Sequence, residues 1–262
     1  MRTWIPDGRF LPYMTWKQVE ALPRDRALVV VPTAAIEQHG HHLPIATDTL
    51  LNNYLLGHAL RLLPAEAPVY ALAPVCYGKS NEHLGFPGTF SLSRDTFAAV
   101  LRDLGTSLKA GGFRKVVFFN SHGGNHAMVD VMARDLRAEH GLTTFCLFGG
   151  GPASGLDPQE AKYGFHAGEV ETALLLDATP DLVHQGRYTA SYIRRLGEPG
   201  VLLPEFAYAT YAWLTRDVSP SGVMGDPAPA TAENGRRWRD EMARRIADAL
   251  AEMVAFEHPP TG

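Results

Sequence analysis

The feature of this sequence that most constrains its fold is a series of short, unbroken apolar runs separated by helical patterns. Four runs rich in β-branched and aromatic residues stand out: Ala27–Pro32, Val69–Val75, Lys115–Asn120 and Leu142–Phe148. Such runs without polar alternation are typical of strands that are covered on both faces, as in a parallel sheet. We therefore predict a layered α/β fold in which a mainly parallel central sheet is flanked by helices.

Helical patterns fill the intervals between these runs. They are Asp48–Leu63, a helix between an N-cap at Ser93 and a stop at Gly111-Gly112, His126–Glu139, and an amphipathic C-terminal helix from near Thr231. The glycine- and proline-rich stretch Gly149–Tyr163 is predicted to be a long loop, a length typical of lids and binding loops. No linker-like stretch interrupts the pattern, so we expect a single domain over residues 1–262.

Charge and cysteine content exclude several classes of protein. The chain has 24 basic and 28 acidic residues and a net charge of −4, which leaves no basic patch for nucleic acid or a membrane surface. Two cysteines cannot form a disulfide framework, so Cys76 and Cys146, each closing an apolar run, are expected to be buried free thiols. The N-terminus lacks a signal-peptide core, and no apolar run approaches the roughly 18 residues of a membrane span. We expect a cytoplasmic protein.

Polar residues gather directly after two of the predicted strands and before one helix. The first strand leads into Glu37–Pro44 and then Asp48, and the third leads into Asn120–Asn125. A third cluster, His166–Thr172, opens an apolar helical run. Ligands of open α/β sheets bind beyond the carboxyl ends of the strands, so these segments can converge at one edge if the sheet is parallel.

The residue types in these clusters predict a metal site. Imidazoles and carboxylates without thiolates suit Zn, Mn or Fe(II). Glu37 and His39 are two positions apart, so an extended segment directs both side chains to the same side. The two oxygens of Asp48 could bridge two ions, and a pair of ions about 3.5–4 Å apart can generate a nucleophile from water at neutral pH.

Each of these residues alone also has a purely structural interpretation. Single histidines are more often hydrogen-bonded structural residues, which is the role we assign to His41, His58, His126, His140 and His184. Asp48 could cap its helix, Gly123-Gly124 could form a tight turn, and Glu169 or Glu171 could complement a helix dipole. The metal site is favoured because five of eleven histidines fall in three such segments beside carboxylates.

Five motifs follow one another along the chain. The first motif begins at Glu37 and reads Glu-x-His-Gly-x-His-Leu-Pro-x-x-Thr-Asp, the second begins at Asn120 and reads Asn-x-His-Gly-Gly-Asn, and the third begins at His166 and reads His-Ala-Gly-Glu-x-Glu-Thr. Two shorter motifs lie at Glu82-His83 with Phe86–Thr89 and at Gly225–Pro227 with Ala230-Thr231. In this order, across residues 27 to 235, they resemble the creatininase (creatinine amidohydrolase) family.

The resemblance implies a parallel α/β fold, a centre of two divalent metal ions and a homo-oligomer, often a hexamer. Carried over residue by residue, Glu37, Asp48 and His122 hold one ion. His39, Asp48 and a glutamate hold the other, with Asp48 as the bridge. His166 is the residue that transfers the proton.

One departure from the family pattern affects the ligand set. Creatininase itself has a glutamate ligand two residues after the histidine of the second motif, where this chain has Gly124. We expect the third motif to supply the missing carboxylate through Glu169, with Glu171 in a supporting position behind the ligands. Ser80, Glu82 and His83 are weaker candidates for substrate contact, and a turn-forming role is an equal alternative.

The resulting functional prediction is hydrolysis of a small-molecule substrate by metal-activated water, with His166 delivering a proton to the leaving nitrogen. Creatininase places tryptophans around its substrate in the loop before the third motif, but no tryptophan lies between Trp16 and Trp213 here. That loop instead offers polar groups, namely Ser154, Asp157, Gln159 and Glu160. We expect cleavage of a C–N bond in a small polar cyclic amide or formamide. The first alternative is hydrolytic C–C ring opening of a cyclic polyol ketone. An alternative of another class is a non-catalytic binding or assembly role on the same fold.

Overall fold

A four-stranded parallel sheet forms the centre of the molecule. The computed structural model describes residues 3–151, 153–194, 197–198, 201–204 and 207–258. The strands β1 (Leu28–Thr33), β2 (Val69–Ala71), β3 (Lys115–Asn120) and β4 (Thr143–Phe148) lie in the order β2-β1-β3-β4, and every neighbouring pair is parallel. This confirms the predicted fold class. The second predicted strand is shorter than expected, because regular pairing ends at Ala71 and only an isolated bridge joins Thr33 to Val75.

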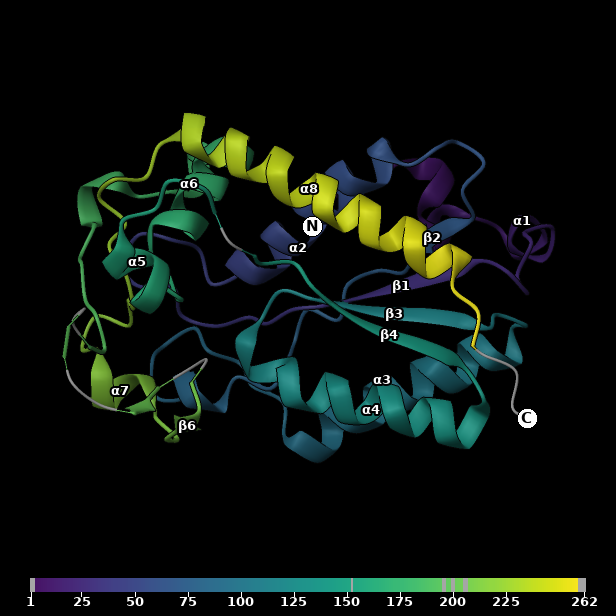
Figure 1. Cartoon of the computed structure of the whole chain (residues 1–262), viewed down its shortest axis with the longest axis horizontal. Coiled ribbons are helices and arrows are strands. Elements are labelled where there is room, and N and C mark those ends of the chain that lie inside the picture. The colour runs from purple at the N-terminus through teal and green to yellow at the C-terminus, as the bar shows by residue number, and fades with distance from the viewer. Residues whose placement is uncertain (1–2, 152, 195–196, 199–200, 205–206, 259–262) are drawn as a thin grey trace.

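Helices cover both faces of this sheet (Figure 1). α2 (Thr47–Leu62), α6 (Glu169–Ala178) and α8 (Ala232–Ala255) share one apolar cluster, and α3 (Arg94–Ala110) and α4 (His126–His140) share the other. Alternate residues of each central strand enter different clusters: Val30 and Phe119 pack toward α2 and α8, whereas Val29 and Phe118 pack toward α3 and α4. Both sides of β1 and β3 are therefore buried, which explains their unbroken apolar runs.

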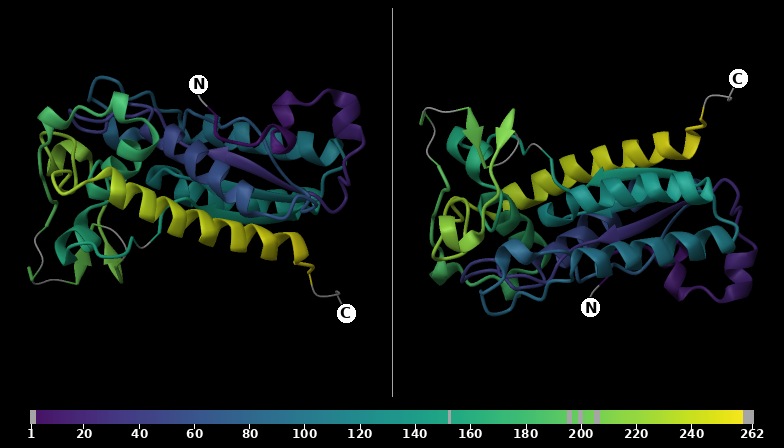
Figure 2. Two further views of the ribbon diagram at one scale, coloured as in Figure 1. Left: turned by 90° about the horizontal axis from the view of Figure 1, so that it is seen from above. Right: turned by 90° about the horizontal axis from the view of Figure 1, so that it is seen from below.

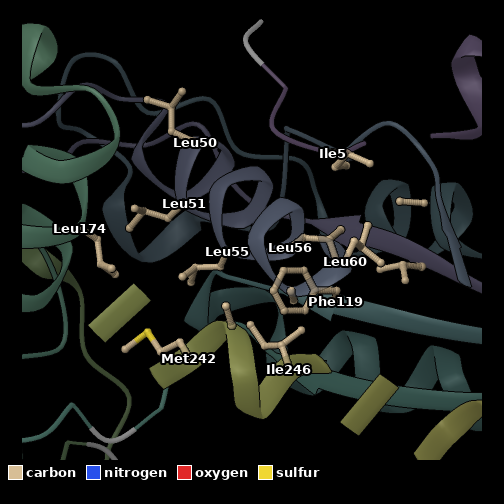
Figure 3. Packing of buried hydrophobic residues seen from close by; sticks show 14 of the residues in the cluster. Ile5, Leu50, Leu51, Leu55, Leu56, Leu60, Phe119, Leu174, Met242 and Ile246 are labelled. Carbon is tan, nitrogen blue, oxygen red and sulfur yellow. The ribbon is translucent and has the colours of Figure 1, made fainter. Parts of the chain in front are cut away.

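The contact between α2, α8 and the sheet is the most extensive apolar layer (Figure 3). Phe119 of β3 lies between Leu56 and Leu60 of α2 and Ile246 of α8, and Leu51 and Leu55 of α2 lie on the side of Met242. The C-terminal amphipathic helix is confirmed, and it begins where predicted, because the Thr231 hydroxyl accepts a 3.1 Å hydrogen bond from Asn234 N. Ser93 caps α3 in the same way through Thr96 N at 3.1 Å.

Shorter elements lie at the two ends of the molecule. They are α1 (Trp16–Glu20), α5 (Pro158–Tyr163), α7 (Thr215–Val218), the small parallel pair β5 (Leu202–Leu203) and β6 (Ala209–Thr210), and 3₁₀ turns η1 (Asp7–Arg9), η2 (Leu11–Tyr13), η3 (Asn81–His83), η4 (Gly123–Asn125), η5 (Pro180–Leu182) and η6 (Gln185–Arg187). Both views in Figure 2 place the yellow-green segment with β5, β6 and α7 at the opposite end from α1.

Two local expectations need correction. The predicted loop Gly149–Tyr163 contains the helix α5, because the Asp157 side chain caps it through Gln159 N at 2.8 Å and Pro158 occupies its first turn. Pro152 lies outside the described residues. Cys76 and Cys146 are free, as expected, but each is half-buried, and Cys146 lies on β4, which is an edge strand of the sheet formed by the described residues. Within the described residues, no helix combines the length and the apolar character that crossing a membrane requires.

Candidate metal centre

The ends of β1 and β3 lie side by side and send their following segments to one edge of the sheet. Thr33 pairs with Asn120 at this edge, and their side chains are joined by a 3.1 Å hydrogen bond. Asn52 of α2 donates to Phe119 O at 2.9 Å, and Asn125 donates to Ala34 O at 3.0 Å. These amide groups satisfy the backbone where pairing stops, so the first two motifs leave the sheet in fixed positions.

The Glu37 carboxylate lies among three imidazoles. Its Oε1 is 3.3 Å from His122 Nδ1, 3.6 Å from His83 Nε2 and 3.7 Å from His166 Nδ1. The Ser80 hydroxyl donates to Oε2. Burial opposes the charge on Glu37, but the histidines outweigh it and hold the pKa of this carboxyl well below its usual range. Ser80 and His83, predicted to contact substrate, are buried against Glu37.

A second group of donor atoms forms around His39. Its Nε2 lies 3.5 Å from Asp48 Oδ1 and 3.8 Å from Glu171 Oε2, while its Nδ1 lies 3.1 Å from the Glu37 carbonyl and donates to it. Burial opposes the charged imidazole, but Asp48, Glu171 and Glu37 outweigh it and raise the pKa of His39 to about 10. The other oxygen of Asp48, Oδ2, is 3.5 Å from His122 Nδ1. Asp48 thus joins the two groups.

The donor set fits divalent metal ions. The described residues form three sets of possible ligands, and within each set the donor nitrogen and oxygen atoms all lie within 4.8 Å of one another. The sets are Glu37, His39 and His166; Glu37, Glu82 and His122; and His39, Asp48 and Glu171. His39 Nε2 and Asp48 Oδ2 are buried without a hydrogen-bond partner among the described residues, which is costly unless a cation binds them. Imidazole and carboxylate ligands without thiolate suit Zn, Mn or Fe(II).

The third motif places Glu169 and Glu171 in different surroundings. Both lie in the first turn of α6, where residues two positions apart do not face the same way. Glu171 Oε2 is the atom beside His39, and it also accepts a 2.6 Å hydrogen bond from Ala167 N. Glu169 is in none of the donor sets of the described residues. Burial raises its pKa most, followed by the nearby carboxylates of Glu160, Asp226 and Asp157. The structure therefore brings Glu171 to His39, whereas the sequence favoured Glu169.

The two nitrogens of His166 have different roles. Nε2 lies 2.8 Å from the Gln38 backbone carbonyl and donates to it, which leaves the lone pair on Nδ1, the atom that faces Glu37. The Gln38 amide nitrogen contacts Gly222 O at 3.0 Å and His83 Nδ1 at 2.8 Å, so its two protons have acceptors. Burial, followed by the nearby His39 and His83, lowers the pKa of His166 well below its usual value. With its proton on Nε2, the ring directs a proton-accepting nitrogen, Nδ1, into the site.

Glu160 organises the segment that carries His166. The sequence assigned this residue to substrate contact, but its buried carboxylate accepts hydrogen bonds from Glu169 N at 2.8 Å, Asp226 N at 2.9 Å and the Tyr192 hydroxyl at 2.8 Å. Side chains at Gly164, Gly168 or Gly225 would collide with it, so the three glycines make room for this carboxylate. Ser154 and Gln159 also bond elsewhere, to Glu241 and to the Arg194 carbonyl.

Two residues at the site carry no signal in the sequence, and five histidines lie outside the donor sets of the described residues. Gln38, whose carbonyl accepts from His166, gave no signal because it lies between two candidate ligands. Trp213 gave none because it follows the third motif by some forty residues. The Trp213 ring lies 6.5 Å from the ring of His83 and 5.8 Å from the ring of Phe165. The five structural histidines, His41, His58, His126, His140 and His184, are all absent from the donor sets. His42 instead links the first motif to the third through Thr172 Oγ1 at 3.0 Å.

A cavity of about 610 Å³ lies beside these donor groups. His166 and Glu171 are among its lining residues, so it is continuous with the candidate metal centre. Most of its remaining side chains are apolar and come from α2, α6, α8 and the segment before the third motif: Leu51, Leu55, Val170, Leu174, Met242, Leu156 and Phe165.

Comparison with known proteins identifies the family. A model for creatininase, described as creatinine amidohydrolase, matches residues 12–250. The mycofactocin precursor peptide peptidase of Mycobacterium tuberculosis (strain ATCC 25618 / H37Rv) is 35% identical over 238 residues, covering 86% of this chain and 87% of that protein. The creatinine amidohydrolase of Pseudomonas putida is 28% identical over 279 residues, covering 96% and 98%.

The fold agrees with solved structures of the same group. A crystal structure of creatinine amidohydrolase (creatininase) superposes with a TM-score of 0.71 at 24% identity, covering 97% of this chain and 99% of that chain. Since the family model spans nearly the whole sequence and the relatives cover most of it, the chain belongs to the creatininase family of metal-dependent hydrolases.

Proposed function

We propose that this chain is a two-metal amidohydrolase that cleaves the C–N bond of an amide. The observation that carries the proposal is the position of Asp48, whose Oδ1 faces His39 and whose Oδ2 faces His122. Glu37, His122 and Asp48 would hold one ion, and His39, Asp48 and Glu171 the other. When bound, such ions lower the pKa of a water molecule and polarise a carbonyl group. Among solved creatininases are a manganese form and a Zn–Zn type.

The protein's own contribution to proton transfer falls to His166. Its Nδ1 lone pair faces the centre, its Nε2 proton is held by the Gln38 carbonyl, and its ring lines the cavity. A neutral imidazole in this position can accept a proton from the attacking water and return it to the leaving nitrogen. Ser80 and His83 support the reaction indirectly, because they fix the Glu37 carboxylate.

The shape and lining of the cavity favour a substrate larger and less polar than creatinine. Its volume of about 610 Å³ lies within the range of small-molecule sites, and apolar groups provide most of its surface. The relatives at 33% and 35% identity are named mycofactocin precursor peptide peptidases. We infer that the substrate is a peptide-type amide with an apolar group beside the scissile bond, in place of the small polar cyclic amide expected from Ser154 and its neighbours.

A substrate panel tests this proposal. Enzyme loaded with Zn, Mn or Fe(II) is assayed on short peptides with apolar or charged residues beside the scissile bond, on creatinine, on a formamide and on a cyclic polyol ketone. We expect turnover of the apolar peptides and little turnover of creatinine. Efficient creatinine hydrolysis, or ring opening of the ketone by C–C cleavage, contradicts the proposed substrate class.

A matched pair of variants links turnover to the cavity. Val170 is half-buried and lines it, so Val170→Trp fills part of the space and should lower kcat/KM for apolar peptides by at least about tenfold. Val131 on α4 is 51% exposed and does not line the cavity, so Val131→Trp is the control and should leave kcat/KM unchanged. Equal effects of the two substitutions would show that the cavity does not bind substrate.

A further inference from the structure

The second motif has no side chain at Gly124, and the space beside this glycine is filled by another part of the chain. A methyl group at position 124 would overlap the Glu82 carboxylate, and would lie 2.5 Å from the Lys79 carbonyl oxygen and 2.6 Å from His122 Nε2. The backbone at Gly124 is not in the left-handed region, so its conformation does not require glycine. Glycine is needed here for room.

The occupant of this space comes from the loop after β2. Glu82 lies in η3, and its Oε1 is 3.4 Å from His122 Nε2, with the carboxylate side chain only 15% exposed. The Lys79 carbonyl lies 3.0 Å from the same nitrogen and accepts its hydrogen bond. Two oxygen acceptors on one side of the ring place the proton of His122 on Nε2.

The other ring nitrogen of His122 faces the candidate ligands. Nδ1 lies 3.3 Å from Glu37 Oε1 and 3.5 Å from Asp48 Oδ2, and the ring is buried. With the proton on Nε2, the Nδ1 lone pair is available to an ion. Metal-binding histidines generally donate their second N–H to a carboxylate or a carbonyl, which fixes the tautomer and the orientation of the ring.

The backbone around Lys79 is held in register with the second motif. Lys79 N donates to Asn125 Oδ1 at 2.8 Å, and Asn125 Nδ2 donates to Ala34 O at 3.0 Å. The loop that carries Lys79 and Glu82 is therefore attached to the loop that carries His122 by the asparagine that ends the second motif. This attachment keeps both acceptors beside Nε2.

We propose that Glu82 is a positioning residue for His122, and that Gly124 is the position that gives its carboxylate access to the ring. Glu82 belongs to one donor set with Glu37 and His122, but its carboxylate approaches Nε2, whereas Glu37 and Asp48 approach Nδ1. We therefore assign it to orienting a ligand and not to binding the ion. The proposal rests on the proposed function in one respect, namely that His122 Nδ1 binds a metal ion.

Two variants and two controls test this role. Glu82→Ala removes the carboxylate, and Glu82→Gln keeps one acceptor oxygen at the same place. Gly124→Ala inserts the methyl group that collides with Glu82, whereas Gly123→Ala is the matched control, because a methyl group there has no atom within 4 Å. For each protein, ¹⁵N NMR of the metal-free form over a pH series reports the protonation of His122 and, where the ring is neutral, its tautomer, and calorimetry with Zn²⁺ reports affinity and stoichiometry.

We expect Glu82→Ala and Gly124→Ala to reduce the Nε2–H tautomer of His122 and to weaken Zn²⁺ binding by about 10–100-fold at unchanged stoichiometry. Glu82→Gln should show a smaller loss, and Gly123→Ala none. If Glu82→Ala does not fold, Glu82→Gln and Glu82→Asp serve for the same comparison.

Several outcomes would overturn the assignment. An unchanged ring spectrum or an unchanged affinity in Glu82→Ala shows that Glu82 does not orient His122. The loss of one metal equivalent at saturating Zn²⁺ shows that Glu82 is a ligand. A native protein that binds no Zn²⁺ refutes the proposed function instead, and the NMR comparison on metal-free protein still decides the role of Glu82.

Discussion

At the scale of single residues, His166 separates proton transfer from metal binding. Its Nε2 is held by the Gln38 carbonyl at 2.8 Å and its Nδ1 lies 3.7 Å from Glu37 Oε1. We expect His166→Ala to keep both metal equivalents at saturating metal and to lose about 10²–10⁴-fold in kcat, the usual contribution of a general acid–base group. Metal analysis and steady-state kinetics on the same preparation check this.

The control for this variant is His126→Ala. His126 is exposed, stacks on Phe148 and is absent from the donor sets, so its removal should leave kcat unchanged. If His166→Ala instead loses one equivalent of metal, the His166 ring is a ligand, and another group must transfer the proton. The presence of His166 in one donor set with Glu37 and His39 is compatible with that outcome.

At the scale of elements, α6 is fixed to its neighbours by one buried carboxylate. Asp177 Oδ2 accepts a 2.5 Å hydrogen bond from Tyr54 of α2 and a 2.8 Å bond from Arg239 of α8, with both charged side chains at most 15% exposed. We expect Asp177→Ala to lower the free energy of unfolding by about 3 kcal/mol, because it leaves the Arg239 guanidinium without its buried partner. Chemical denaturation measures the difference.

The same carboxylate provides its own control. Arg236 also pairs with Asp177, at 3.5 Å, but its side chain is 64% exposed. Arg236→Ala should therefore cost less than about 1 kcal/mol. If both variants cost the same, the attachment of α6 depends on apolar packing alone.

At the scale of the whole molecule, the metal centre connects three distant parts of the chain. Its donors follow β1, follow β3 and open α6, so an ion that binds them stabilises the folded state over the unfolded chain. We expect Zn²⁺ at a hundred times its dissociation constant to raise the free energy of unfolding by about 2.7 kcal/mol, and chelator to remove this gain. Thermal melts of wild type and of His39→Ala check it, since the variant should show a much smaller shift. The homo-oligomer, often a hexamer, stays a prediction that light scattering can examine.

Much of the fold and of the site could be predicted from local patterns. The apolar runs predict β1 and β3 because both faces of a central parallel strand are buried, and this requirement is visible in the sequence itself. Ser93 and Thr231 mark helix starts because capping depends on the side chain and the next three residues. Once the sheet is parallel, the segments after β1 and β3 must leave it at one edge, so Glu37, His39 and His122 come together without further information.

The remaining choices depended on tertiary packing. Whether Glu169 or Glu171 faces His39 is set by the rotation of α6, and its continuous apolar run Ala173–Leu176 gives no preferred face until α2 and α8 pack against it. The approach of Glu82 to the space at Gly124 joins residues 42 positions apart in different loops. Local periodicity reports which residues are buried, but contacts between loops depend on where the chain returns after each crossover, and only the folded structure determines this.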